Sequence, residues 1–309
     1  MQVSVIMAVY NGERFLEETI ESVLGQTFTD FEFVIVNDGS IDHSAEILDR
    51  YKRQDSRIVI VSQANCGIAD SLNRAISISR SELLAHIDAD DRALPSWLER
   101  QLDFLARHPD CSVVSSYAHL INSAGRRIGK SQNVVDVDKG RAEMNPNHFL
   151  DIVHSTVLMR KSDVLVTGGY RKGFLGVEDR DLWGRIVTAG MMIRCNSELL
   201  VEYRLHSGSI TVSKLKKSEE RRGINVNVVR RMRGEREFSP SETEEWFRSR
   251  PFAEKFTDQR RVFSGRYFRS ASRHYADRRW LKFLWTFGVA TAIRPVYVLR
   301  RAVSKLGGA

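Results

Sequence analysis

Short apolar runs alternate along residues 1–110 with longer segments whose apolar residues recur at helical spacing. Residues 3–9 predict a buried strand, and residues 33–36, 58–61 and 83–87 predict three more. This alternation is typical of a parallel sheet with crossover helices. The chain therefore predicts an α/β fold with a Rossmann-like, mainly parallel central sheet flanked by helices.

Carboxylates directly follow the fourth of these runs, at Asp88, Asp90 and Asp91. Ionised carboxylates that crowd the end of a buried strand repel one another unless a cation lies between them. Oxygen ligands of this kind suit Mg²⁺ or Mn²⁺, especially where the phosphates of a substrate complete the coordination. Because Pro95 and Ser96 open a helix soon afterwards, an acidic helix start is the alternative interpretation.

A second acid, Asp38, also lies at the end of a predicted strand. Ligands of open parallel sheets bind outside the carboxyl ends of the strands, so Asp38 and Asp88 should line one crevice. Neither GxGxxG nor GxxxxGK[ST] follows the first strand, which argues against a dinucleotide dehydrogenase and a P-loop nucleoside triphosphatase. Asp38 can instead accept a hydrogen bond from a base or ribose, although Asn37-Asp38-Gly39 also suits a plain turn.

Several short motifs follow one another in a fixed order over about residues 2–211. They are VIMAVYNG at 5–12, VNDGS at 36–40, NCGI at 65–68, DADD at 88–91, HST at 154–156, GGY at 168–170, EDRDLW at 178–183 and YRLH at 203–206. In their order and spacing these segments resemble family 2 glycosyltransferases. The resemblance implies a GT-A fold, a nucleotide-diphosphate sugar donor with UDP as the expected nucleotide, a divalent Mn²⁺ or Mg²⁺ ion, and transfer with inversion at the anomeric carbon. Ile41 and His43 stand where the family more often has threonine and a small residue, which casts little doubt on activity.

The same resemblance assigns roles to the acids at the strand ends. Asp38 is expected to read the base, and Asp88 is expected to lie on the ribose side of the nucleotide. Asp90 is the expected metal ligand, and Asp91 is expected to support these acids or to bind the sugar.

Other positions carry weaker expectations. Val9 and Tyr10 would lie beside the base, although an apolar residue at a strand's end more often belongs to the core. His206 matches a family position near the metal and diphosphate, and a neutral imidazole can bind Mn²⁺. His154 precedes residues 155–159, which are expected to form a strand. His154 is expected to line the acceptor or sugar pocket, with a structural role as the alternative. Arg204 is expected to be a surface cation, with phosphate pairing as the alternative.

The resemblance places the general base in the pair Glu178 and Asp179, with Asp179 preferred and Glu178 or Asp181 as alternatives. An acceptor hydroxyl is a weak nucleophile until a base takes its proton, and that base must lie across the sugar from the leaving diphosphate. A metal on the diphosphate side stabilises the charge that develops there. These acids also fit the first turn of an amphipathic helix whose Leu182 and Trp183 face the core.

The composition, with 42% hydrophobic and 28% charged residues, is that of a globular chain. A net charge of +8 indicates an anionic partner, such as a phosphate-bearing substrate, nucleic acid or an acidic membrane. Cys66, Cys111 and Cys195 form no CxxC pair, so neither a disulfide framework nor a zinc site is expected. No secretion signal precedes the first strand, and a cytoplasmic location is therefore expected.

The resemblance fades beyond residue 211, where basic residues crowd a segment that predicts a helix with a solvated basic face. The expected domains are a GT-A catalytic domain at 1–211, divided into a nucleotide-binding half at 1–110 and an acceptor-binding half at 111–211, and a basic helical C-terminal region at 212–309.

Residues 280–290 are strongly apolar and aromatic. Lys282 and Arg294 interrupt this run and leave it shorter than the ~20 apolar residues that a spanning helix needs. A basic, Trp-bearing amphipathic segment can instead lie in the membrane interface. Residues 279–301 are therefore a candidate for peripheral docking on the inner face of the cell membrane, and packing on the catalytic domain is the rival interpretation.

Taken together, these features predict an inverting, metal-dependent glycosyltransferase of hexosyltransferase type. Its expected acceptor is a glycan or a lipid-linked glycan in cell-surface polysaccharide or lipopolysaccharide synthesis. A metal-dependent nucleotidyltransferase is the alternative enzyme, but it has no evident use for a separate base at Glu178 and Asp179. A non-catalytic nucleotide-binding or nucleic-acid-binding protein is the other alternative. Nucleic acid is not an expected partner, because acidic strand ends repel its phosphates without a metal.

Overall fold

The chain divides into two compact units, one made of residues 1–119, 130–203 and 224–237, and the other of residues 120–129, 204–223 and 238–309. The expected domain boundary between residues 211 and 212 lies outside the described residues and stays a prediction. The computed structural model describes residues 2–131, 136, 152–174, 176–206, 216–252, 260, 263–264, 267, 270–271, 274, 279–295 and 297–298.

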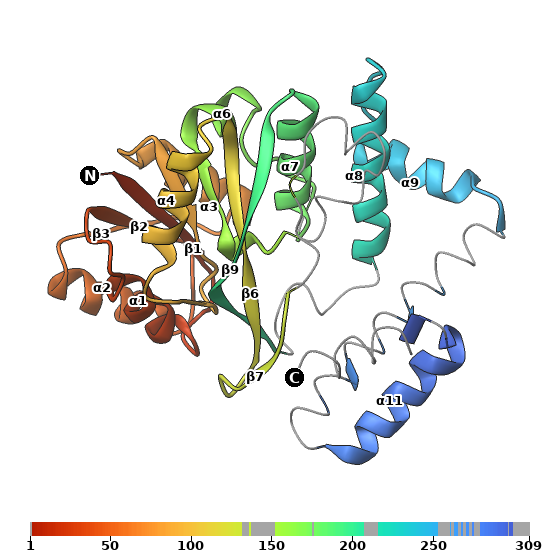
Figure 1. Cartoon of the computed structure of the whole chain (residues 1–309), viewed down its shortest axis with the longest axis horizontal. Helices are drawn as coiled ribbons and strands as arrows, with labels where there is room; N and C mark the ends of the chain where they lie inside the picture. Colours follow the sequence, from red (N-terminus) through yellow and green to blue (C-terminus); the bar gives the residue numbers. More distant parts are fainter. Residues whose placement is uncertain are drawn as a thin grey trace. The chain divides into compact units, whose positions relative to one another are not determined.

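The four strands predicted for the N-terminal half are all present (Figure 1). β1 pairs in parallel with β2 and with β4, and β2 pairs in parallel with β3, so the predicted parallel arrangement is confirmed for this half. The strands are β1 (Val3–Val9), β2 (Phe31–Asn37), β3 (Ile58–Ser62) and β4 (Leu83–His86).

The register of these strands brings their carboxyl ends to one edge of the sheet. Val9 lies opposite Asn37, and Ile6 lies opposite His86. The main chain continues this alignment past the strand ends, because the N–H of Asp38 donates to the carbonyl of Val9 at 2.8 Å. The turns that follow β1, β2 and β4 therefore lie side by side, as the sequence predicted.

The remaining described strands extend the sheet in antiparallel fashion. β8 pairs antiparallel with β4 and with β6, and β5 pairs antiparallel with β9. The order along the sheet is β3-β2-β1-β4-β8-β6-β9-β5. Residues 155–159 were expected to form one strand, but the 3-10 turn η2 (His154–Thr156) comes first and the strand begins after it. These strands are β5 (Arg92–Ala93), β6 (Cys111–Asn122), β7 (Arg127–Lys130), β8 (Leu158–Arg160) and β9 (Met192–Leu205).

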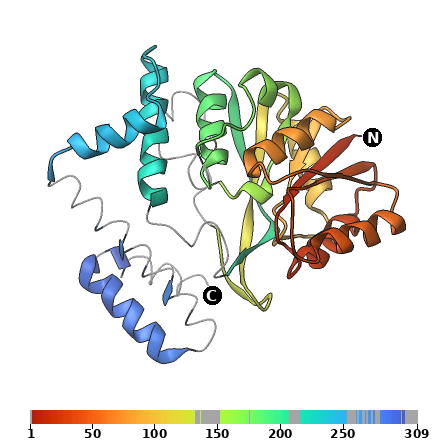
Figure 2. The ribbon, with the colours of Figure 1, turned by 180° about the vertical axis from the view of Figure 1, so that it is seen from behind.

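Helices cover both faces of this sheet, which Figures 1 and 2 view from opposite sides. One buried cluster joins alternate residues of β1 to α1, α2 and α4, and a second joins the opposite face to α3, α6, α7 and α8. The described helices are α1 (Leu16–Leu24), α2 (Ser44–Gln54), α3 (Ile68–Ile78), α4 (Trp97–Arg107), α6 (Lys161–Val166), α7 (Glu178–Thr188), α8 (Lys216–Met232), α9 (Pro240–Ser249) and α11 (Trp280–Ile293).

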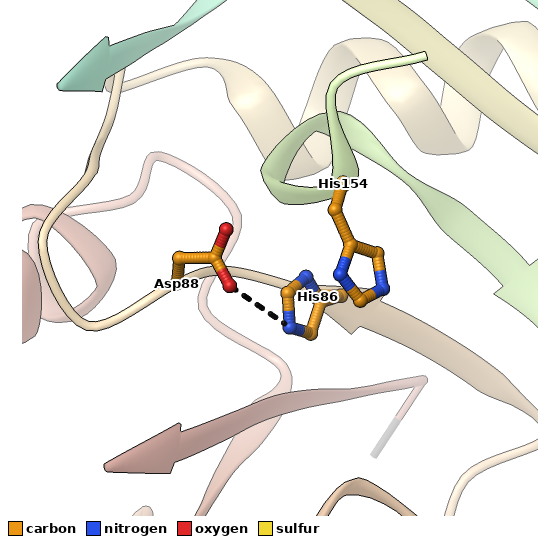
Figure 3. Close-up of side chains that lie close together, drawn as sticks. All are labelled: His86, Asp88 and His154. Atoms are coloured by element: carbon orange, nitrogen blue, oxygen red, sulfur yellow. Dashed lines mark ion pairs between the residues drawn. The ribbon is translucent and has the colours of Figure 1, made fainter. Parts of the chain in front are cut away.

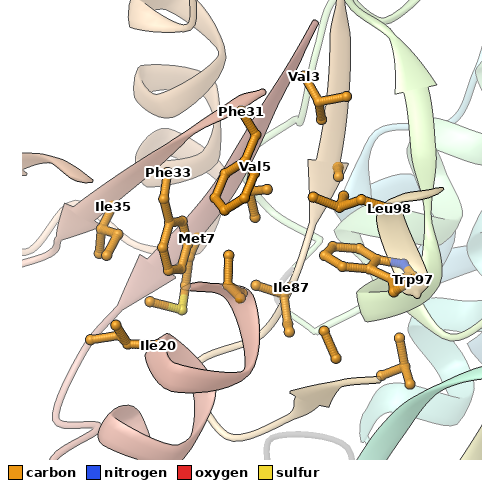
Figure 4. Close-up of a cluster of buried hydrophobic side chains, with 14 of the residues drawn as sticks. Val3, Val5, Met7, Ile20, Phe31, Phe33, Ile35, Ile87, Trp97 and Leu98 are labelled. Atoms are coloured by element: carbon orange, nitrogen blue, oxygen red, sulfur yellow. The ribbon is translucent and has the colours of Figure 1, made fainter. Parts of the chain in front are cut away.

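The alternation of side chains along β1 explains why both faces are apolar. Val3, Val5 and Met7 point into the cluster with α1, α2 and α4, where they meet aromatic side chains such as Phe33 (Figure 4). Ile6 points the other way, into the second cluster. A strand buried on both faces reads as a continuous apolar run, which is why the sequence identified it.

Helix α7 combines a buried apolar stripe with an acidic first turn. Leu182, Trp183 and Ile186 are fully buried, as the helical spacing predicted. Glu178 and Asp179 open the helix, where its macrodipole stabilises negative charge. The stripe therefore fixes the helix against the sheet, and the acids at its N-terminus take a defined position.

Helix α11, in the second unit, is apolar on both sides rather than amphipathic as expected. Thr286 and Ala290 are buried on one side. Among the described residues, no helix is both long enough and apolar enough to cross a membrane. The other side, called here the exposed face of α11, presents Trp280, Leu281, Leu284 and Trp285, which are 53%, 85%, 63% and 63% exposed.

Candidate active site

The turns after β1 and β2 are tied together by side chains. The N–H of Asn11 donates to the Ser40 hydroxyl at 3.0 Å, and the N–H of Gly12 donates to the Ser44 hydroxyl at 2.9 Å. In return, the N–H of Ile41 donates to the side-chain oxygen of Asn11 at 2.9 Å. These bonds satisfy main-chain groups at the strand ends and hold the two turns as one rigid rim.

Asp38 lies in this rim and is buried. Its carboxylate accepts hydrogen bonds from the N–H groups of Cys66 and Gly67, at 2.9 and 2.8 Å, and from the Gln63 amide at 2.9 Å. Burial would raise the pKa of Asp38, but these hydrogen bonds outweigh it and lower the pKa below its ordinary value. Asp38 is therefore an ionised group that joins the turn after β2 to the turn before α3.

The two residues expected beside the base differ in exposure. Val9 is 1% exposed and packs in the core with α1, α2 and α4, so its structural alternative fits its position. Tyr10, the next residue, is 52% exposed at the rim. Tyr10 is therefore the member of this pair whose ring is accessible to a ligand.

Ser155 connects the acids that follow β4. Its hydroxyl lies 2.5 Å from a carboxylate oxygen of Asp91 and 3.1 Å from one of Asp88, and it accepts from the N–H of Asp88 at 3.1 Å. Asp91 is fully buried, and its carbonyl accepts from the Thr19 hydroxyl at 2.7 Å. Asp91 thus lies behind the rim in a supporting position, whereas the Asp88 side chain is 30% exposed.

Negative charge accumulates around Asp88. Burial raises the pKa of Asp88 to about 8, with Asp90 adding the next largest contribution. The hydrogen bond from Ser155 opposes this increase, and the charges of Glu178 and Asp179 strengthen it. The acids of α7 therefore act on the same space as the acids after β4, although 90 residues separate Asp88 from Glu178. Carboxylates crowded in this way fit a divalent cation, which removes their repulsion.

The three acids of α7 have different surroundings. Glu178 is buried, and its carboxylate accepts from the N–H of Gly176 at 2.5 Å. Asp179 is half-buried, and one of its oxygens accepts from the N–H of Arg180 at 2.8 Å. Asp181 is 1% exposed. Asp179 therefore has the most accessible carboxylate of the three.

Asp181 belongs to a buried network of arginines. One of its oxygens accepts from Arg171 Nε at 2.8 Å and from Arg185 Nε at 3.0 Å, and its other oxygen accepts from Arg171 as well. Arg171 also donates to Glu237 at 2.9 Å. Asp181 thus pairs with two guanidinium groups and anchors α7, which is a structural task.

His154 lies under the acid cluster in a stack of two imidazoles (Figure 3). Its ring and that of His86 lie 3.6 Å apart at an angle of 16°, and His154 Nε2 lies 2.7 Å from the Tyr170 hydroxyl. Burial lowers the pKa of His86 to about 3 and lowers the pKa of His154 well below its ordinary value. Both rings are therefore neutral, and the structural alternative for His154 fits its burial.

His86, Asp88 and His154 offer one potential metal-ligand atom each, and these atoms lie within 4.8 Å of one another. The lone pair of an imidazole nitrogen lies in the plane of its ring. Because the two rings are stacked nearly parallel, their lone pairs do not converge on one ion. His154 Nε2 is also engaged with Tyr170. The oxygen cluster of Asp88 and Asp90 is the better match to a hard divalent cation.

Two residues near the end of β9 complete the set of sequence candidates. His206 directly follows the strand and lies in the second unit, and its role at a metal stays a prediction. Arg204 is 1% exposed, so the expectation of a surface cation was wrong. The residue lies within the strand, where the sequence pattern gave no sign that this side chain points inward.

Three site residues had no assigned role in the sequence interpretation. Ser155 joins two of the acids, Gln63 supports Asp38, and His86 stacks beneath Asp88. A polar residue inside an otherwise apolar run was the available sign for His86. For Ser155 and Gln63 the contacts cross between distant segments, and spacing along the chain does not reveal them.

The chain is similar to known proteins over most of its length. Residues 4–165 match the family described as Glycosyl transferase family 2. An uncharacterized glycosyltransferase of Methanocaldococcus jannaschii is 32% identical over 70% of this chain and 75% of its own length. The O-antigen biosynthesis glycosyltransferase WbnJ of Escherichia coli is 33% identical over 69% of this chain and 83% of its own.

A solved structure confirms the expected GT-A fold. The crystal structure of S. aureus TarS 1–349 in complex with UDP-GlcNAc superposes with a TM-score of 0.61, at 18% identity, and the match covers 96% of this chain and 91% of that chain. At this level of identity the likeness concerns the fold and not the substrate.

Proposed function

This chain belongs to glycosyl transferase family 2, and we propose that it transfers a sugar, with inversion, from a UDP-sugar to an acceptor hydroxyl. The observation that carries the proposal is the family match of residues 4–165, and Glu178 and Asp179 lie near enough to Asp88 for their charges to act on it. A transferase of this kind needs carboxylates on both sides of the transferred sugar.

The donor nucleotide is proposed to bind along the rim formed by the turns after β1 and β2. Tyr10 is exposed there and offers a ring face to the base. Asp38 fixes the Gln63–Gly67 side of the rim through its three hydrogen bonds, and as an ionised acceptor it can bond an N–H of the base. UDP is the proposed nucleotide, because TarS, which shares the fold, is described with UDP-GlcNAc.

The metal is proposed to bind at Asp90, with Asp88 beside it on the ribose side and with Asp91 supporting Asp88 through Ser155. A divalent ion held there supplies electrostatic stabilisation of the diphosphate leaving group.

Asp179 is proposed as the general base. Its carboxylate is half-buried and accessible, whereas Glu178 is buried against Gly176 and Asp181 is paired with two arginines. In the reaction, Asp179 takes the proton of the acceptor hydroxyl as its oxygen attacks the anomeric carbon. The bond from that carbon to the diphosphate breaks on the opposite face, which gives the inverted product.

The proposed acceptor is a lipid-linked or surface glycan, supported by the O-antigen role that the name of the E. coli relative states. The exposed face of α11 supports a peripheral membrane location for such a reaction. Leu281 and Leu284 are 85% and 63% exposed, and the cations Arg279 and Lys282 flank them. Apolar contact combined with positive charge favours an interface of anionic lipids.

Calorimetric titration of nucleotide diphosphates and UDP-sugars, with Mn²⁺ or with a chelator, tests the donor site. UDP is expected to bind only with Mn²⁺, and Asp90→Ala is expected to abolish this binding. The control variant Asp49→Ala removes an exposed acid on α2 and should bind as the natural chain does. Absence of binding by any nucleotide with Mn²⁺ would contradict the proposal. Release of pyrophosphate from a nucleoside triphosphate would instead identify a nucleotidyltransferase.

A further inference from the structure

A line of polar side chains runs from the acid cluster to the segment that precedes α7. Figure 3 shows its first three members, Asp88, His86 and His154. It begins at Asp88, continues through the stacked rings of His86 and His154, and ends at the Tyr170 hydroxyl. The four residues come from the turn after β4, the end of β4, the turn η2 and the loop before α7. Segments that are distant in sequence thus meet through one set of side-chain contacts.

Both ends of this line are held in place. The oxygens of Asp88 lie between Ser155, at 3.1 Å, and His86 Nε2, at 3.6 Å. At the other end, the main chain of Tyr170 exchanges two hydrogen bonds with the Asn73 side chain on α3, at 2.7 and 2.9 Å. The Tyr170 hydroxyl therefore has a fixed position from which to orient His154.

Apolar side chains would pack this region at a lower free-energy cost, because burying polar imidazole rings removes their solvation by water. The stack also lies against Trp183 of α7, whose ring meets His154 edge-on at 6.0 Å. A direct metal site is a poor explanation, since the parallel rings do not aim their nitrogens at one point. What the line does provide is a defined position for His86 Nε2 beside Asp88.

We propose that His86, His154 and Tyr170 are positioning residues that orient Asp88 for donor binding. The 3.6 Å separation is slightly longer than a hydrogen bond, so a small shift of Asp88 on donor binding would let His86 Nε2 donate to it. His154 fixes the plane of the His86 ring, and Tyr170 fixes His154. The inference rests on the proposed function, because it assigns these residues to the donor site.

The test measures the affinity of UDP with Mn²⁺ for His86→Phe, Tyr170→Phe and the double variant. His86→Phe keeps a ring for the stack but loses Nε2, and it is expected to weaken UDP binding about tenfold or more, the scale of a hydrogen bond to a charged group. Tyr170→Phe removes one hydroxyl and is expected to weaken binding about threefold to tenfold. The double variant should resemble His86→Phe alone, because the two changes interrupt the same line.

Two further variants separate positioning from general damage. His86→Gln retains an N–H donor of similar reach and should recover most of the lost affinity. His108→Phe replaces a histidine that stacks on Phe104 outside the site, with ring centres 4.3 Å apart, and should leave UDP affinity unchanged. Thermal unfolding of each variant checks that the fold is retained.

The outcomes are distinguishable from failure of the proposed function. If the natural chain binds no UDP with Mn²⁺, the proposed function fails. If the natural chain binds UDP and His86→Phe binds equally well, or His86→Gln fails to recover binding, the positioning role is overturned. If His86→Phe abolishes binding of Mn²⁺ alone while Asp90→Ala retains it, the stack is a metal site and the inference is wrong.

Discussion

Asp179 and Asp181 lie two positions apart at the start of α7, and a helix turns residues at this spacing to different sides. Asp181 points inward to Arg171 and Arg185, and Asp179 remains half-buried at the edge of the site. The resemblance preferred Asp179 as the general base and kept Asp181 as an alternative. The surroundings of the two acids fit the proposed catalytic role for Asp179 and a structural role for Asp181.

Replacement of Asp179 by asparagine tests the catalytic role. Asn has nearly the same shape but cannot take a proton, so sugar transfer should fall about 100- to 10,000-fold while the affinity for UDP with Mn²⁺ stays unchanged. Release of UDP from the donor, measured with and without acceptor, provides the rate. Transfer at the natural rate in Asp179→Asn would assign the base elsewhere, with Glu178 as the next candidate.

The same substitution at Asp181 should lower the stability of the fold, whereas Asp179→Asn should lower the rate of sugar transfer. Asp181→Asn leaves two guanidinium groups facing a neutral amide in a buried position, so the free energy of unfolding should fall by about 3 kcal/mol. Urea unfolding measures this loss. Because Arg171 retains its hydrogen bond to Glu237, the loss of unfolding free energy should lie at the lower end of the range for broken buried ion pairs. A fully active, equally stable variant would show that the network contributes nothing.

Glu32 provides a pH-dependent contribution to stability far from the strand-end acids. It is 1% exposed and accepts from the Ser4 hydroxyl at 2.6 Å and from the N–H and Nε of Arg80 at 2.7 and 2.8 Å. Burial alone would raise its pKa, but the hydrogen bonds from Ser4 and Arg80 lower it from the ordinary 4.5. A carboxyl group with a lowered folded-state pKa stabilises the protein above its unfolded-state pKa and loses this contribution as pH falls.

Glu32→Gln should therefore lower the free energy of unfolding by about 1.5–3 kcal/mol at neutral pH, the scale of hydrogen bonds to a charged group. The difference between the variant and the natural chain should shrink as pH falls below the ordinary 4.5 of the unfolded state. Urea unfolding at several pH values measures both curves. A difference independent of pH would show that the charge of Glu32 is not what stabilises the fold.

At the scale of elements, the turn after β2 depends on a glycine. Gly39 has a φ of +72°, and a Cβ atom there would lie 2.8 Å from the main-chain nitrogen of Asn65. Gly190 has a similar φ of +86°, but open space surrounds its Cβ position. Replacing either glycine by alanine therefore strains the left-handed backbone, but only the Cβ atom at position 39 would also clash with a neighbour.

Gly190→Ala should cost about 1–2 kcal/mol from the left-handed conformation alone, and Gly39→Ala should cost at least about 1 kcal/mol more. Because the clash displaces the turn whose N–H groups bind Asp38, only Gly39→Ala should also weaken UDP binding. Chemical unfolding and calorimetric titration of both variants provide the comparison. Equal losses of stability in Gly39→Ala and Gly190→Ala would show that the turn around Asn65 moves aside without disturbing Asp38.

The sequence predicted the elements that have a local pattern of apolar residues, but it did not predict contacts between distant segments. The four parallel strands and α7 followed from runs and spacings, because a strand or helix buried against a core must repeat its apolar residues. The strand β8 was predicted to begin too early, because Ser155 and Thr156 directly precede an apolar run and threonine suits a strand, yet both residues form a turn. The inward position of Arg204 and the contacts of Ser155 arise from pairing between distant segments, which no periodicity records.

At the scale of the whole molecule, the sign of the net charge is opposite to the sign of the charge at the candidate site. The chain carries a net charge of +8, yet its strand-end site gathers Asp38, Asp88, Asp90 and Asp91. Cations elsewhere on the chain can attract an anionic donor or anionic lipids over about one Debye length. In the proposed reaction, the acids would bind the diphosphate only with a divalent ion between them. The positive charge and the acidic site would thus serve successive steps.

The exposed face of α11 yields the corresponding prediction for the second unit. The full chain should float with vesicles that contain anionic lipid, and it should float less with neutral vesicles or at high salt. Leu281→Ser combined with Leu284→Ser should reduce the bound fraction at least about tenfold, because apolar area supplies much of the affinity. The control pair Leu165→Ser and Val166→Ser removes side chains that are 54% and 74% exposed on α6 in the other unit, and it should bind as the natural chain does.

Lys282→Glu separates the two contributions to this binding. It leaves the apolar face intact and changes the sign of one flanking charge, so binding to anionic vesicles should weaken by about 2 kcal/mol, given about 1 kcal/mol for each basic residue near the surface. Binding to neutral vesicles should not change. Flotation that is equal for the natural chain and all these variants would exclude the exposed face of α11 as a membrane contact. The same result would leave the glycosyltransferase site untouched, since its tests use soluble UDP.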